Sequence, residues 1–410
     1  MFDSVYDRQG KNILCLIYAG GYVFIELKKA KRKLTEHFKK LKTKMKIALL
    51  LGVIGISSSS FFLFPFKIQQ EIKAQIKKEI HLEKEIEDTL ITIVAVGDIM
   101  MGTNYPSESY LPPNNVFLLN PMHEFLQQAD VTFGNLEGTI LNSGGKVKSC
   151  SDPSKCYAFR QPEYFVSHLK TAGFDFLSMA NNHMGDFGQE GRDNTARILR
   201  ENGFRFAGLE TCPWDTLTVK GVTIGMTAFA PNTACLQITD YATLQSVVSK
   251  LNSFCDIVIV SFHGGAEGSG KTHVTRKTEI FYQENRGNVY EFARVAIDAG
   301  ADVVLGHGPH VTRAIDSYKG KFITYSMGNF CTYGRFNLNG VSGMAPLFQL
   351  RLTKKGEFVD GRIIATKQLG EGGPVIDETN GALEQIKSLT GTDIPELKVE
   401  YGENGRFKFK

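Results

Sequence analysis

Short apolar runs that stop abruptly at a polar side chain recur along the chain from residue 91 onward. Residues 176–179 form one such run, which ends in Asn181, Asn182 and His183. A run of this kind is typical of a buried parallel strand. Four other runs have the same form and end in Asp98, in Asn135 and Glu137, in His263, and in His307 and His310. Since open α/β sheets bind ligands beyond the carboxyl ends of their strands, we expect these side chains to meet at one site.

Strand-like and helix-like segments alternate in this part of the chain, which predicts an α/β domain. The expected strands cover residues 91–96, 131–133, 176–179, 223–229, 257–262, 303–305 and 322–326. The expected helices cover residues 163–172, 189–202, 242–254 and 289–299. Two antiparallel strands are expected between residues 345 and 366. The polar, glycine-rich residues 371–410 are expected to form a loosely held tail.

The first 90 residues have a different pattern. Residues 47–66 contain no charged side chain, and as a helix of about 30 Å they are long enough to cross a bilayer. Residues 28–46 hold ten Lys and Arg residues and one Glu, and positive flanks of this kind remain in the cytoplasm. The pattern predicts a basic cytoplasmic segment (1–46), one transmembrane helix in the plasma membrane, and a large extracytoplasmic domain. An uncleaved anchor is favoured over a removed export signal, and both Met1 and Met45 remain candidate starts.

Charge separates this N-terminal part from the rest. Residues 67–90 alternate Lys and Glu with Ile at helical spacing, which predicts an exposed helical stalk. The basic run at residues 28–46 contributes +9 to a net charge of +4, so the remainder of the chain carries −5. A mildly acidic main domain argues against a general nucleic-acid-binding protein.

Seven cysteines are present. Cys150 and Cys156 flank a short loop with Pro and Ser, and outside the membrane this pair can close a small disulfide. A metal clip is less favoured there because no second Cys/His pair is near. Cys212 and Cys235 are candidates for a second bridge.

The polar strand ends offer the ligands that divalent ions prefer. Hard and borderline ions bind carboxylate, amide oxygen and imidazole. Four of the nine histidines lie at such ends. A single histidine there is more often structural, but four of them beside Asp98, Asn135 and Glu137 favour a metal site or a phosphate-type site.

Six motifs in fixed order carry a family resemblance. They are GDIMMG, GNLEG, NNHMGDFG, SFHGGAE, GADVVLGHGPHV and ITYSMGNF. Together they resemble the CapA or PGA_cap family of bacterial capsule (poly-γ-glutamate) synthesis, from about residue 91 to about residue 352. That family is similar to the calcineurin-like metallophosphoesterases. The resemblance implies a four-layer α/β/β/α sandwich over residues 91–370 with a metal site above the strand ends.

The resemblance also implies ligands, substrate and partners. It implies one or two divalent ions (Mn, Fe or Zn), an anionic surface polymer or phosphoester as substrate, and other capsule-synthesis membrane subunits as partners. The implied metal ligands are Asp98, Asn135, Glu137, Asn182, His263, His307 and His310. His183 is implied as a proton donor or phosphate contact. Met100 replaces a family histidine, and Asn135 stands where a bridging aspartate is usual. These departures favour one ion, or a weakly held second, over a tight pair.

Three charged residues near the motifs have open roles. Glu267, four positions after His263, is a candidate general base or supporting partner, and equally a solvated loop carboxylate. Arg313 and Arg335 are candidates for holding an anionic substrate, and equally surface charges.

Three functional hypotheses follow. The first is an anchored metal-dependent hydrolase or transferase. The second is a non-catalytic subunit that holds or exports the polymer. The third is a sensor or docking domain in which the histidines are structural.

Overall fold

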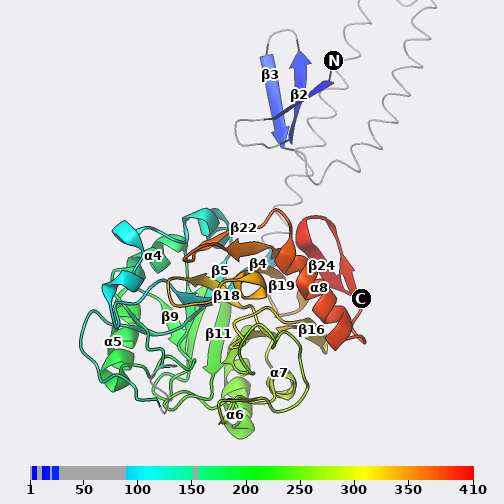
Figure 1. Cartoon of the computed structure of the whole chain (residues 1–410). Coiled ribbons are helices and arrows are strands. Elements are labelled where there is room, and N and C mark those ends of the chain that lie inside the picture. The colour runs from blue at the N-terminus through cyan, green and yellow to red at the C-terminus, as the bar shows by residue number, and fades with distance from the viewer. Residues whose placement is uncertain (1, 7–11, 19–20, 27–88, 151–155) are drawn as a thin grey trace, which may run out of the picture. The chain divides into compact units, whose positions relative to one another are not determined.

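The computed structural model describes residues 2–6, 12–18, 21–26, 89–150 and 156–410, in two compact units, Met1–Glu83 and Lys84–Lys410 (Figure 1). In the first unit, β1 (Phe2–Tyr6), β2 (Asn12–Tyr18) and β3 (Gly21–Glu26) form an antiparallel sheet. The predicted transmembrane helix (47–66) and residues 67–88 of the predicted stalk lie outside the described residues. Within the described residues, no helix is long and apolar enough to cross a membrane.

Two sheets form the centre of the second unit. The larger has the order β23-β24-β20-β19-β4-β5-β8-β9, with β18 beside β4, and the smaller has the order β10-β11-β12-β15-β17-β16. The strands of the larger sheet are β4 (Leu90–Met100), β5 (Val131–Leu136), β8 (Phe176–Ser178), β9 (Arg205–Ala207), β18 (Asn329–Thr332), β19 (Leu347–Thr353), β20 (Phe358–Ile364), β23 (Val399–Tyr401) and β24 (Arg406–Phe409). Those of the smaller sheet are β10 (Trp214–Val219), β11 (Val222–Phe229), β12 (Ile257–His263), β15 (Val303–His307), β16 (Ile315–Tyr318) and β17 (Lys321–Thr324).

Helices cover the outer faces of both sheets, except α8, whose Ala382, Leu383 and Ile386 join the core between the sheets. The helices are α3 (His123–Gln127), α4 (Phe165–Ala172), α5 (Gly188–Glu201), α6 (Tyr241–Asn252), α7 (Val289–Asp298) and α8 (Gly381–Asp393). Short strands are β6 (Thr139–Ile140), β7 (Arg160–Gln161), β13 (Ile280–Phe281), β14 (Glu284–Asn285), β21 (Thr366–Gln368) and β22 (Pro374–Ile376). Single 3-10 turns are η1 (Glu108–Tyr110), η2 (Pro113–Asn115), η3 (Asn120–Met122), η5 (Gly340–Gly343) and η6 (Glu403–Gly405).

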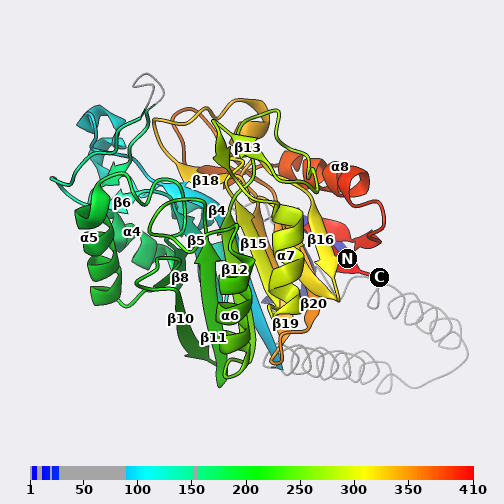
Figure 2. The same cartoon turned by 90° about the horizontal axis from the view of Figure 1, so that it is seen from below.

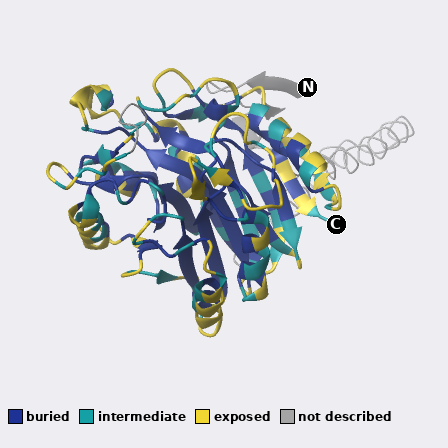
Figure 3. Cartoon of the chain, turned by 60° about the horizontal axis from the view of Figure 1, so that its bottom comes forward, coloured by how far each residue is buried: buried dark blue, intermediate teal, exposed yellow. Residues whose placement is uncertain are grey.

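The alternation of side chains along β4 explains the layering. Ile93 and Ala95 pack with Ile224 and Ile259 of the smaller sheet, in a core between the two sheets. Val94 and Val96 point the other way, into a core with α4 and α5. A third core joins the smaller sheet to α6 and α7, which Figure 2 shows in front of β12 and β15. Because side chains alternate across a strand, each sheet has apolar neighbours on both faces, and the layers run helix, sheet, sheet, helix. Figure 3 shows the central strands buried and most exposed residues on helices and loops.

The predicted α/β domain is confirmed, with differences at element ends. The first predicted strand (91–96) continues in the structure to Met100, because β18 pairs with its last residues. This extension keeps Asp98 inside a strand. The short strand β9 and the edge strands β10 and β16 were not predicted.

The prediction of a loosely held tail over residues 371–410 is wrong. This segment holds β22, α8, β23 and β24, and β24 pairs with β20 in the larger sheet. Its polar, glycine-rich composition favours a tail, but Leu383, Ile386 and Leu389 recur at the spacing of one helix face and are buried in α8. Ile394 and Phe407 are buried as well.

We expect Phe407→Ala to lower the free energy of unfolding of the full chain by about 3–5 kcal/mol, the usual cost of removing a buried phenyl ring. Phe407 is 2% exposed and its ring lies within 6 Å of those of Phe322 (5.9 Å), Phe358 (5.9 Å) and Phe409 (5.8 Å). Urea unfolding followed by circular dichroism measures the change. Phe254→Ala, at a ring that is 48% exposed, is the control. A loss no larger than that of the control would mean that the segment adds little to the fold.

Of the two predicted disulfides, one is present. Cys150 and Cys156 are bonded, with Cα atoms 5.6 Å apart. The predicted Cys212–Cys235 bridge is wrong, because both are free thiols. Cys212 accepts a hydrogen bond from Arg200, whereas the Sγ of Cys235 lies 3.9 Å from the carbonyl oxygen of Met179.

Candidate metal centre

The candidate centre lies at the carboxyl ends of neighbouring parallel strands from both sheets. β4 carries Asp98 and β5 carries Asn135, and these two residues are paired in register. β12 and β15 end in His263 and His307, which are also paired in register. Glu137 follows directly after β5, and His310 lies three residues beyond β15. Buried strands thereby hold most of the polar groups, and short turns supply the rest.

Asp98 joins the two sheets. Its Oδ1 accepts from Asn135 Nδ2 at 2.8 Å and lies 3.1 Å from His307 Nδ1, and its Oδ2 lies 3.0 Å from His310 Nδ1. Burial alone would raise the pKa of Asp98, but hydrogen bonds with His307 and His310 lower it far below its usual value. The carboxylate therefore stays ionised. Burial alone would lower the pKa of His310, yet Glu137, Asp98 and Glu267 together raise it to about 10.

Glu137 is a fully buried carboxylate without hydrogen bonds to either of its oxygens among the described residues. His310 Nε2 lies 3.5 Å from Oε1, and His183 Nε2 lies 3.9 Å from the same atom. Burial raises the pKa of Glu137 well above its usual value, against the opposing charge of His310.

Several further buried polar atoms of the candidate ligands also have no hydrogen-bond partner in the described part of the chain. They are Asn182 Oδ1, His263 Nε2 and His307 Nε2. One atom each from Glu137, His263 and His310 lie within 4.8 Å of one another. Buried polar groups are nearly always satisfied, so this concentration needs an explanation. Carboxylate, amide oxygen and imidazole fit a divalent ion such as Mn, Fe or Zn.

Asn135 is engaged with protein atoms at both ends of its amide. Its Nδ2 donates to Asp98, and its Oδ1 accepts from Asn181 Nδ2 at 3.3 Å. Asn181 also donates to the carbonyl oxygen of Leu136 at 2.8 Å and accepts from the backbone N–H of His183 at 3.1 Å. Asn181 therefore orients Asn135 and His183. The sequence places Asn181 at the strand end, but of the two neighbouring asparagines only Asn182 was predicted to have a role.

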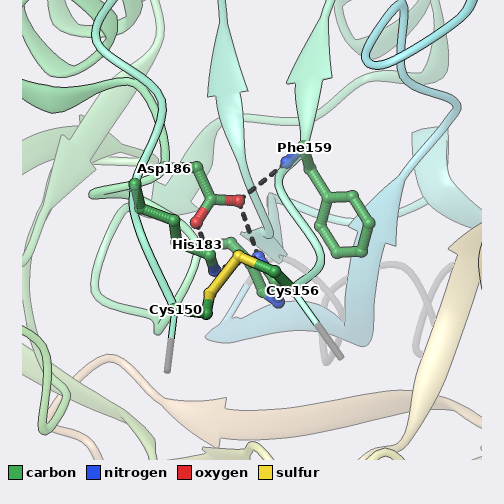
Figure 4. Close-up of a disulfide and its surroundings, with 6 residues drawn as sticks. Cys150, Cys156, Phe159, His183 and Asp186 are labelled. Atoms are coloured by element: carbon green, nitrogen blue, oxygen red, sulfur yellow. Dashed lines mark hydrogen bonds and ion pairs between the residues drawn. A yellow bond between two sulfur atoms is a disulfide. The ribbon is translucent and has the colours of Figure 1, made fainter. Parts of the chain in front are cut away.

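His183 is paired with Asp186, which sequence analysis did not single out. His183 Nδ1 lies 2.7 Å from Asp186 Oδ2 (Figure 4). Burial lowers the pKa of His183, although Asp186 opposes the shift. A neutral ring with its proton on Nδ1 donates to Asp186 and turns Nε2 toward Glu137. The signal in the sequence was a carboxylate three positions after the histidine, which is common by chance.

Glu267 lies at the rim of the centre and is held by a buried arginine. Its side chain is 19% exposed, and Oε1 lies 2.9 Å from Arg286 Nη2. It accepts from Asn182 Nδ2 at 3.3 Å and lies 3.9 Å from His310 Nε2. Arg286 also pairs with Glu284 at 2.9 Å. Arg286, which was not predicted from the sequence, reaches the site from beside the β13–β14 hairpin.

The two arginines proposed from the sequence lie in different surroundings. Arg313 is fully buried; its Nη1 and Nη2 donate to Glu279 at 2.8 and 2.9 Å, and its Nε donates to the carbonyl oxygen of Lys271. Because its guanidinium is bonded to protein groups in the interior, the expectation that Arg313 contacts substrate is corrected. Arg335 is half-buried, with its guanidinium 4.7 Å from the ring of Tyr110 and 4.8 Å from that of Tyr157. Among the described residues, Arg335 has no carboxylate within ion-pair distance.

We expect Arg313→Ala to lower the free energy of unfolding by about 3–5 kcal/mol, because it leaves Glu279 buried and unpaired. Arg335→Ala removes only contacts with two tyrosine rings, and we expect a loss of at most about 2 kcal/mol. Chemical unfolding of the two full-length variants beside the unchanged chain provides the comparison. Equal losses in the two variants would contradict the structural role of the Arg313–Glu279 pair.

Comparison with known proteins places these residues in a family. The family model "Bacterial capsule synthesis protein PGA_cap" matches residues 92–333, more than half of the chain, including every candidate ligand named above. The chain is 28% identical over 266 residues to "Capsule biosynthesis protein CapA" of Bacillus anthracis, covering 60% of this chain and 61% of that protein. It is 26% identical over 317 residues to "PGA biosynthesis protein CapA" of Bacillus subtilis, covering 73% and 78%.

Two solved structures from Thermus thermophilus are similar in fold, with loose overall superposition. One is a hypothetical protein, at a TM-score of 0.43 and 14% identity, covering 68% of this chain and 100% of that one. The other is a 5'-nucleotidase precursor, at a TM-score of 0.37 and 12% identity, covering 75% and 59%. The family assignment rests on the sequence match over residues 92–333. The chain belongs to the PGA_cap family of bacterial capsule synthesis proteins.

Proposed function

We propose that this protein is a metal-dependent hydrolase or transferase that acts on an anionic surface polymer or a phosphoester in capsule or poly-γ-glutamate synthesis. One observation carries the proposal: Glu137, Asn182, His263 and His307 have buried ligand atoms with no hydrogen-bond partner among the described residues, and Glu137 lies 3.9 Å from the His183 ring of a histidine–aspartate pair. A ligand cluster beside a group that can move a proton is the arrangement expected of metal-assisted hydrolysis. The names of the relatives, which concern capsule and PGA biosynthesis, supply the substrate class.

In this proposal, one set of residues holds the metal ion. Glu137, His263 and His310 would hold a divalent ion, with Asp98, Asn182 and His307 beside them. When bound, such an ion lowers the pKa of water and polarises the attacked phosphoryl or acyl group.

Asp186 fixes His183 with its proton on Nδ1 and stabilises the imidazolium that forms when Nε2 takes up a proton. His183 can then pass that proton to the leaving group. Arg335, which has no carboxylate partner in the described part of the chain, is available to an anionic substrate.

The test is metal content and turnover of the full chain purified without chelator. We expect about one or two equivalents of a transition ion, and turnover of bis(p-nitrophenyl) phosphate or a γ-glutamyl anilide that chelator abolishes. Bound metal without turnover of any phosphoester or γ-glutamyl amide would reject the catalytic proposal. Absence of metal after reconstitution with manganese, iron or zinc would reject the metal centre and favour a sensor or docking role.

A non-catalytic polymer-binding subunit is the second candidate. Two residues favour this candidate. Asn135 donates an N–H to Asp98 from a position where a carboxylate would add negative charge. Met100 is buried at a position where the family pattern has a histidine. His183→Ala distinguishes the two candidates. A catalytic protein loses turnover and retains polymer binding, whereas a binding subunit has no turnover to lose.

We further propose that residues 47–66 anchor the chain in the plasma membrane, with the family domain outside and available to other membrane subunits of capsule synthesis. The unequal charge on the two sides of this segment supports the orientation. Protease added to intact cells is expected to cleave the chain beyond Leu90. Protection of that domain while residues 28–46 are accessible would reverse the orientation.

A further inference from the structure

The Cys150–Cys156 disulfide closes a loop whose two legs both end on Asp186 (Figure 4). On one leg, the N–H of Lys148 donates to the carbonyl oxygen of Asp186 at 2.8 Å, and its Nζ lies 2.5 Å from Asp186 Oδ1. On the other leg, the N–H of Phe159 donates to Asp186 Oδ2 at 2.7 Å. The disulfide lies two residues after Lys148 and three residues before Phe159.

The same two legs also contact His183 directly. The ring of Phe159 lies on that of His183, with centroids 4.2 Å apart and planes inclined by 31°. Lys148 Nζ lies 3.5 Å from His183 Nδ1. Asp186 and His183 are therefore enclosed by groups that come from both sides of one cross-link, and Asp186 is fully buried among them.

Four of the candidate metal ligands are held differently. Asp98, Asn135, His263 and His307 belong to strands of the two sheets, and their positions are set by strand pairing. His183 and Asp186 lie instead in the turns between β8 and α5. Turns have fewer fixed partners than strands, so an external restraint matters more for this pair.

We propose that the Cys150–Cys156 disulfide is a positioning element for His183. By joining the two legs, it lowers the entropy lost in holding Lys148 and Phe159 on Asp186 at the same time. That restraint fixes the place of the His183 ring beside Glu137. Its effect on turnover rests on the proposed function. The arrangement also suits a domain outside the membrane, where disulfides persist.

The test uses the full chain, loaded with metal, before and after treatment with a dithiol. Two electrons and two protons pass from the dithiol to the protein: the S–S bond breaks, two thiols form, and the reagent becomes a cyclic disulfide. We expect kcat to fall about 10- to 100-fold, the scale of a misplaced proton-transfer group, while KM and metal content stay the same. Reoxidation should restore kcat.

Two variants control for other effects of the reagent. Cys150→Ser with Cys156→Ser should start at the lowered kcat and show no further response to the dithiol. Cys255→Ser, at a free thiol elsewhere in the structure, should respond as the unchanged chain does.

Amide hydrogen exchange supplies a readout that does not depend on activity. The Phe159 and Lys148 N–H groups should exchange at least about tenfold faster after reduction, because local opening controls exchange. The buried β12 amides serve as the internal reference. Unchanged exchange at Phe159, or unchanged kcat after full reduction, would overturn the proposal. A chain that binds metal but turns over no substrate would reject the catalytic function, and exchange at Phe159 alone would then decide whether the disulfide holds Asp186.

Discussion

Replacing His263 by alanine should empty the metal centre. His263 is fully buried, and its Nε2 has no hydrogen-bond partner among the described residues. It lies in the set with Glu137 and His310 whose ligand atoms are within 4.8 Å of one another. Loss of a residue that only hydrogen-bonds to a metal ligand typically lowers metal affinity by roughly 10- to 100-fold. Removing one of these three ligands should lower metal affinity by more than that. Metal analysis of the desalted full chain measures the loss.

His273→Ala is the matched control for that experiment. The His273 side chain is 60% exposed and pairs with Asp393, away from the candidate ligands. Glu137→Gln is a second test variant, because it keeps the side-chain volume while removing the negative charge, and we expect it to lose metal as His263→Ala does. Circular dichroism shows whether each variant is folded. A folded His263→Ala protein with the metal content of the unchanged chain would contradict the assignment.

Much of the centre could be predicted because parallel strands converge at one sheet edge. Asp98, Asn135, His263 and His307 each follow an apolar run, and the strand register sets them side by side. The pattern of apolar and polar residues contains that information. It does not contain the direction of the Asn135 amide, which depends on Asn181, a residue that packs from another strand end.

Charged residues outside the strand ends could not be assigned from sequence. Arg313 and Arg335 look alike as isolated arginines near a motif. Only the fold reveals that Glu279, 34 positions before Arg313, neutralises it inside the protein, whereas Arg335 lies against two tyrosine rings. Arg286 was missed for the same reason, because its partner Glu267 is 19 positions away and no local pattern connects them.

The C-terminal segment illustrates a different limit. Periodicity detects an element when its apolar residues are frequent enough to repeat. In α8, Leu383, Ile386 and Leu389 do recur at helical spacing, but only over a short stretch of a polar segment. Contacts with elements far apart in sequence, such as those of Ile386 and Phe407, hold the segment on the domain. Tertiary packing therefore determines this segment more than local preference does.

Asp186→Asn should reduce turnover by about 10²- to 10⁴-fold while leaving metal content intact, because it removes the charge that orients and stabilises His183. Asp186 Oδ2 lies 2.7 Å from His183 Nδ1, and the strand-borne candidate ligands do not depend on it. Turnover and metal content of the full chain are measured together. The exposed Asp193, on α5, supplies the matched control Asp193→Asn.

Combining Asp186→Asn with His183→Ala tests whether the two residues act as one unit. Residues that serve a single proton-transfer step are strongly non-additive, so the double variant should be no slower than His183→Ala alone. Independent roles would instead multiply the two losses. Multiplied losses, or loss of metal in Asp186→Asn, would mean that Asp186 supports the centre as a whole and does not act through His183. Retained metal with non-additive loss of turnover would identify the pair as the proton-transfer group of the site.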